Sequence, residues 1–82
     1  MHILLQQIAP GLPAPRFVRL ALREDLFGGW ELIRESGQLG GKSQVRRELF
    51  LSQAEAREAL ETACAALARR GFVAQTPQLD AA

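Results

Sequence analysis

The feature that most constrains the fold of this chain is a single amphipathic helix, which the sequence predicts between Ser52 and Gly71. Ser52 followed three residues later by Glu55 is a capping box, a pattern typical of helix N-termini. At the other end, two arginines complement the helix dipole, and Gly71 suits the position after the last turn. The apolar face is rich in alanine, so we expect close packing against a sheet; it comprises Ala56, Leu60, Ala63, Cys64 and Leu67.

The chain before this helix has the two-residue period of β-strands. Residues 16–23 alternate most clearly, and the apolar face consists of Val18, Leu20 and Leu22. Residues 44–51 alternate again, with Val45 and Leu49 set against Arg46 and Glu48. Further strands are predicted at residues 3–8 and 30–35, with a short one at 73–76. The glycine-containing segments 24–29 and 36–43 connect them. The sequence therefore predicts an α+β fold, a small antiparallel sheet of about four strands with one amphipathic helix packed across it.

The length of 82 residues fits one domain with a modest core. Three prolines between positions 10 and 15 forbid helix there and remove strand donors. We therefore divide the chain into an N-terminal strand with a proline-rich loop (1–15), a main domain (16–76) and a flexible tail (77–82). Residues 3–8 are too short and too polar for a signal peptide, and nothing reaches membrane-spanning length. We expect a cytoplasmic protein with no membrane partner.

The charge is distributed unevenly although the net charge is only +1. Residues 16–47 contain seven Lys/Arg and four Asp/Glu, a balance of +3, whereas residues 48–70 contain three and four, a balance of −1. A basic first half suits a phosphate-bearing or acidic partner, although ordinary solvated charge gives the same pattern.

Catalytic and metal-binding motifs are not found in this sequence. Cys64 and His2 are each the only residue of their kind, so no disulfide or cysteine-based zinc cage is expected. The run Gly41-Lys42-Ser43 resembles the end of a phosphate-binding P-loop, but the glycine required at position 36 is a serine. No histidine lies near Ser36 to activate it. We predict a non-enzymatic protein without cofactor or metal.

The basic residues of the second predicted hairpin are the strongest candidates for a binding site. Arg34, Lys42, Arg46 and Arg47 lie on the two strands and the glycine loop between them, where cations and backbone amides suit phosphate. The other interpretation is that they are edge-strand charges that prevent aggregation. Trp30, beside a glycine on a strand, is more typical of core than of a base-stacking platform.

These segments together resemble the WGR domain family. The resemblance rests on Asp-Leu-Phe-Gly-Gly-Trp at 25–30, Leu-Ile-Arg-Glu at 32–35, the glycine/lysine loop before Gln44-Val45-Arg46, and Arg-Arg-Gly-Phe at 69–72. It is closest to the small stand-alone bacterial members and extends from Ile8 to Phe72. The resemblance implies a nucleic-acid-binding module with an antiparallel sheet and one helix. In poly(ADP-ribose) polymerases such a domain helps to bind broken DNA and to relay that event to other domains.

The family signature itself is changed in this chain. At the position of the Trp-Gly-Arg triplet the sequence has Ser36-Gly37-Gln38, so the glycine remains without its stacking and phosphate-binding neighbours. The resemblance implies a weak nucleic-acid interface without sequence preference, formed by Arg34, Gly37, Gln38, Lys42, Gln44, Arg46 and Arg47. The alternative is a domain that kept the scaffold for protein–protein interaction or self-association. The expected partner is thus DNA or, in the alternative, a protein or a second copy.

Overall fold

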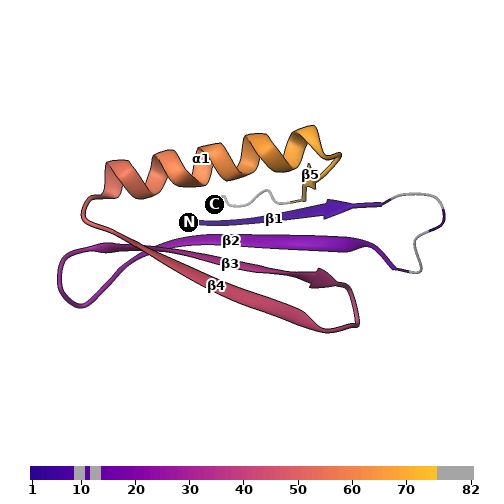
Figure 1. Ribbon diagram of the computed structural model, residues 1–82, viewed down its shortest axis with the longest axis horizontal. Coiled ribbons are helices and arrows are strands. Elements are labelled where there is room, and N and C mark those ends of the chain that lie inside the picture. Colours follow the sequence, from indigo (N-terminus) through magenta and orange to yellow (C-terminus); the bar gives the residue numbers. More distant parts are fainter. Residues whose placement is uncertain (9–10, 12–13, 76–82) are drawn as a thin grey trace.

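The computed structural model describes residues 1–8, 11 and 14–75, and shows a five-stranded antiparallel sheet with one helix across one face (Figure 1). The order of strands in the sheet is β4-β3-β2-β1-β5. This arrangement confirms the predicted α+β fold, while the predicted tail at 77–82 lies outside the described residues. The elements are β1 (His2–Gln7), β2 (Arg16–Glu24), β3 (Trp30–Gln38), β4 (Ser43–Phe50), α1 (Gln53–Arg69) and β5 (Val73–Ala74).

The core lies between α1 and one face of the sheet. The alternation of β2 places three of its apolar side chains beneath the helix, and Leu20 is completely buried there. Trp30 is half-buried and packs against this core, as its place beside a glycine predicts. The helix contributes alanine and leucine side chains to this core, and the small alanines let it lie close to the strands. The buried residues of the helix are Ala56, Leu60 and Leu67.

Both ends of α1 follow the sequence signals. The Oγ atom of Ser52 accepts a hydrogen bond of 3.2 Å from the N–H of Glu55. At the C-terminus, Gly71 has a φ of +91°. The N–H groups of Gly71 and Phe72 donate to the carbonyls of Ala68 and Leu67, both at 3.0 Å. This pattern is a Schellman motif, and it returns the Phe72 ring into the core, where it is buried.

The third strand is longer than the sequence predicts. We expected a loop from Ser36 to Ser43, but β3 continues through Gln38, because each of the last three residues of β3 pairs with a residue of β2. The connection to β4 is correspondingly tight. The N–H of Gly41 donates to the carbonyl of Gln38 at 2.9 Å, and Gly40 has a φ of +79°. These are the features of a type II turn, which requires a positive φ at its third position.

Val45 and Leu49 of β4 face the opposite way from the core residues of β2. Leu32 of β3 must face the helix, and its cross-strand partner is Glu48, so the even-numbered residues of β4 lie on the helix side. Val45 and Leu49 therefore point to the uncovered face, where they are 55% and 71% exposed. The alternation of residues 44–51 is real, but Val45 and Leu49 do not join the core, whereas Phe50 packs against it.

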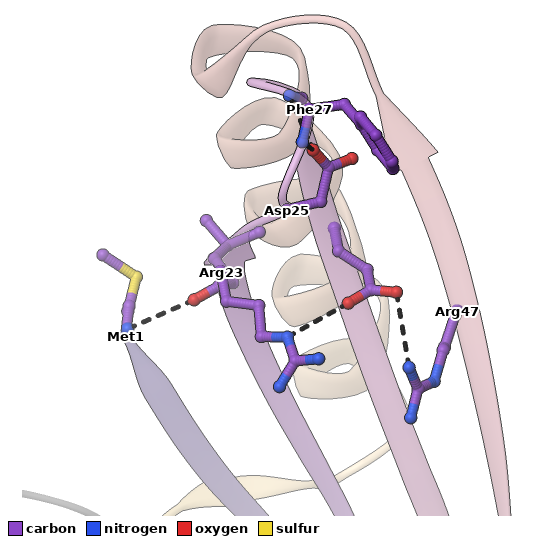
Figure 2. Close-up of polar contacts among 8 residues, drawn as sticks. Met1, Arg23, Asp25, Phe27 and Arg47 are labelled. Carbon is purple, nitrogen blue, oxygen red and sulfur yellow. Dashed lines mark hydrogen bonds and ion pairs between the residues drawn. The ribbon is translucent and has the colours of Figure 1, made fainter.

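The β2–β3 turn is organised by one carboxylate (Figure 2). The Oδ1 atom of Asp25 accepts hydrogen bonds from the N–H of Phe27 at 2.8 Å and from that of Gly29 at 2.9 Å. We expect Asp25→Ala to lower the free energy of unfolding by about 1–2 kcal/mol, because two backbone donors lose their acceptor. Asp25→Asn keeps an acceptor oxygen and should retain most of the stability. Urea unfolding of both variants checks this, and equal losses would show that the hydrogen bonds are not responsible.

The uncovered face of the sheet carries paired charges. The carboxylate of Glu31 is buried between Arg23, at 3.2 Å, and Arg47, at 3.6 Å (Figure 2). Next to it, Arg19 pairs with Glu35 at 2.8 Å. All ion pairs among the described residues lie on this face. Its positive charge is therefore neutralised locally.

Candidate nucleic-acid interface

A cleft of about 490 Å³ opens at one end of the helix-covered face. The C-terminal end of α1 and the β3–β4 hairpin both lie at this end of the molecule (Figure 1). The cleft is bounded by the start of β2, the end of β3, the start of β4 and the residues that follow the helix. Its lining residues are Arg16, Phe17, Val18, Arg34, Ser36, Gly37, Gln38, Lys42, Ser43, Gln44, Arg70 and Phe72.

The structure brings most of the predicted site residues together in this cleft. Five of the seven line it, together with Ser36 of the signature position: Arg34, Gly37, Gln38, Lys42 and Gln44. Arg46 lies next to it, in an adjoining cavity of about 400 Å³ that Arg34 also lines. Arg47 also contributes to the lining of the adjoining cavity, but its guanidinium group lies on the opposite face of the sheet in an ion pair with Glu31.

Two cleft cations were not predicted from the sequence. Arg16 begins β2 and pairs directly with Gln38 across the sheet. Arg70 is the C-cap of α1, and its carbonyl oxygen accepts a hydrogen bond from Nε2 of Gln7 in β1. Both positions depend on strand pairing and helix docking. The only sequence signal was that each residue is basic and lies at the border of a predicted element.

The cleft is positively charged, and none of the described residues that line it carries a carboxylate. Its four cationic side chains come from separate parts of the chain, namely Arg16, Arg34, Lys42 and Arg70. Among the described residues, none of them lies within ion-pair distance of an acidic group. Such a concave site concentrates positive potential and attracts anions. This is the reverse of the uncovered face, where the arginines are paired.

Two arginines face each other across the strands beside the cleft. Arg34 of β3 and Arg46 of β4 are cross-strand partners on the helix side of the sheet. Like charges directly opposite in a sheet are destabilising. A bound anion between or beside the two guanidinium groups would relieve that repulsion. The acidic residue Glu48 lines the same adjoining cavity as this pair.

The signature position lies in the wall of the cleft rather than on an exposed loop. Ser36 and Gln38 are both half-buried, since they lie on the helix-facing side of β3. Gly37 between them is required by packing. A Cβ atom there would clash with the carbonyl oxygen of Lys42 and would lie 2.9 Å from the Cα of Ser43.

The described residues show little that suggests nucleophilic or metal chemistry. Burial, with the nearby charge of Glu61, raises the pKa of the Cys64 thiol, so the nucleophilic thiolate is disfavoured at neutral pH. Within the same residues, no three His, Cys, Asp or Glu side chains are grouped as metal ligands. The described helix is not long and apolar enough to cross a membrane. What the cleft offers chemically is a set of cationic hydrogen-bond donors.

Comparison of the chain with protein-family models, curated proteins and solved structures finds no match. The resemblance to the WGR family therefore stays a prediction from the sequence. The geometry of the cleft is independent of it.

Proposed function

We propose that this protein is a non-enzymatic module that binds the phosphate backbone of nucleic acid in the cationic cleft, weakly and without sequence preference. The observation that supports it best is the cleft itself, where, among the described residues, four basic side chains form no ion pair and no carboxylate lines the wall. Phosphate contacts from arginine, lysine and backbone N–H groups provide most of non-specific affinity for nucleic acid. The resemblance to the WGR family agrees with this function.

The composition of the lining favours backbone contacts over base recognition. Its two aromatic side chains, Phe17 and Phe72, are only 8% and 5% exposed, so they offer little surface on which a base could stack. Phosphate contacts position a nucleic acid but carry no sequence information. We therefore propose that single-stranded, nicked and blunt DNA differ in affinity through shape and charge density alone.

Fluorescence anisotropy with labelled single-stranded, nicked and blunt DNA at low salt tests the proposal. We expect micromolar binding that weakens steeply as salt is added, because counterions are released from the DNA. Arg16→Glu should reduce the affinity about tenfold and make the salt dependence less steep, since one phosphate contact is lost.

Arg57→Glu is the matched control for this experiment. Arg57 is an exposed arginine of α1 that does not line the cleft, and its reversal changes the net charge by the same amount. Binding should fall clearly less than for Arg16→Glu. Equal losses in the two variants would mean that overall charge, and not the cleft, attracts DNA. Absence of micromolar binding by the unmodified chain would refute the proposal.

A further inference from the structure

The longest open edge of the sheet is β4. The strand at the other edge, β5, has two residues, whereas β4 has eight. All β4 residues from Ser43 to Leu49 are exposed. In the described part of the chain, no strand pairs with the outer side of β4. Native proteins usually protect such an edge, because its free N–H and C=O groups can pair with another strand.

The outward backbone groups of β4 can be identified from the neighbouring strands. The N–H of Asp25 donates to the carbonyl of Gly29 at 2.9 Å, and the N–H of Leu39 donates to that of Pro15 at 3.0 Å. In an antiparallel pair the hydrogen-bonded residues alternate, so the odd-numbered residues of β2 and β3 bond to each other. The even-numbered residues of β3 then bond to β4. Consequently the N–H and C=O groups that point outward are those of the odd-numbered residues of β4, namely Ser43, Val45, Arg47 and Leu49.

We propose that β4 pairs antiparallel with β4 of a second copy, about a two-fold axis at Arg47, to form a symmetric dimer with one continuous sheet. In this register, Arg46 lies opposite Glu48 of the second copy on the helix side. Val45 lies opposite Leu49 of the second copy on the uncovered face. The symmetry repeats each match, so the interface contains two opposite-charge pairs and two apolar pairs.

Charge complementarity favours this register over the two-fold registers whose axis lies one residue earlier or later. A two-fold axis one residue earlier, at Arg46, would place Arg46 opposite Arg46 of the second copy. A two-fold axis one residue later, at Glu48, would place Glu48 opposite Glu48 of the second copy. Each of these shifts sets like charges face to face and places Arg47 opposite an apolar residue.

The axis at Arg47 does bring two copies of that arginine together. Each one, however, is already paired with its own buried Glu31 at 3.6 Å, which offsets the repulsion. The two apolar residues involved, Val45 and Leu49, are those that the fold leaves exposed at 55% and 71%. The dimer therefore gives a partner to the apolar residues of β4 that do not join the core.

Analytical ultracentrifugation over a concentration series, without nucleic acid, tests this proposal independently of the proposed function. We expect a monomer–dimer equilibrium in the unmodified chain. Val45→Pro removes an outward N–H while leaving the β3–β4 hydrogen bonds in place, so it should abolish the dimer. Val45→Thr is its control, because threonine keeps the N–H and the strand conformation. Circular dichroism would establish that both variants are folded.

A charge exchange provides a second test that does not depend on proline. Glu48→Arg should raise the dissociation constant of the dimer about tenfold, because it places arginine opposite Arg46 of the other copy. Adding Arg46→Glu to the same chain reverses both members of the pair and should restore dimerisation. A strict monomer at all concentrations would overturn the proposal. So would a dimer that persists in folded Val45→Pro, or a charge exchange that fails to restore association.

Discussion

Replacing Arg34 with glutamate is expected to weaken DNA binding about 10- to 100-fold while leaving the fold as stable as before, or more stable. Arg34 lines both the cleft and the adjoining cavity, so its reversal removes a phosphate contact and adds a repulsive carboxylate at the centre of the site. In the folded chain the same carboxylate would lie opposite Arg46. A like-charge pair thereby becomes an opposite-charge pair, which contributes about 0.2–1 kcal/mol to stability.

Anisotropy titrations and urea unfolding of this variant measure the two effects separately. Arg34→Gln removes the repulsion without introducing a negative charge, so it should fall between the unmodified chain and Arg34→Glu in both measurements. If Arg34 contacts the nucleic acid, its replacement lowers the affinity and does not lower the stability; if Arg34 is structural, its replacement lowers the stability as well. If affinity and stability were lost together, Arg34 would be a structural residue and the proposed interface would lose its central member.

The second large effect is expected at Gly37, where alanine should lower the free energy of unfolding by about 2–3 kcal/mol. The added Cβ would meet the carbonyl oxygen of Lys42 and the Cα of Ser43, both backbone atoms of the neighbouring segment. Backbone atoms cannot rotate away as a side chain does, so the hairpin must open. Since that hairpin forms one wall of the cleft, DNA affinity should fall in the same variant.

Gly41→Ala is the control within the same hairpin. A Cβ atom at Gly41 would have its nearest neighbour at 3.5 Å, and the residue has no positive φ. We expect a change in unfolding free energy of less than about 0.5 kcal/mol. Thermal melts of the two variants side by side distinguish a packing requirement at Gly37 from a general cost of replacing glycine. Similar melting temperatures of the two variants would exclude a specific packing requirement at Gly37.

The fold could be predicted where the signals are local. The start and end of α1 depend on residues within one turn of Ser52 and Gly71, and the alternation of β2 is complete in itself. The orientation of β4 is different, because Val45 and Leu49 alternate correctly whichever face they occupy. Only the pairing of Leu32 with Glu48 decides which face joins the core. That pairing is a property of the whole sheet.

The residues of the candidate site also differ in whether local sequence or the packing of the whole sheet brings them together. The residues of one hairpin, such as Arg34 and Lys42, could be grouped because a turn brings them together. Arg46 and Arg47 are neighbours in sequence but point to opposite faces, so the period of a strand separates them. Arg16 and Arg70 join the cleft only through the docking of β2 against β3 and of the helix against the sheet. Basic composition alone could not identify them.

The strand order has a consequence for how the molecule assembles and opens. β1 to β4 follow one another across the sheet as they do along the chain, so each pairing closes a short segment and can form early. Among the strand pairings of the described residues, only that of β5 with Leu5 and Gln6 joins distant parts of the chain. We expect this closure to form last and to open first. Arg70 and Phe72, just before β5, form one wall of the cleft. We expect that wall to loosen before the hairpin wall does, so that opening of the β1–β5 pairing would widen the cleft.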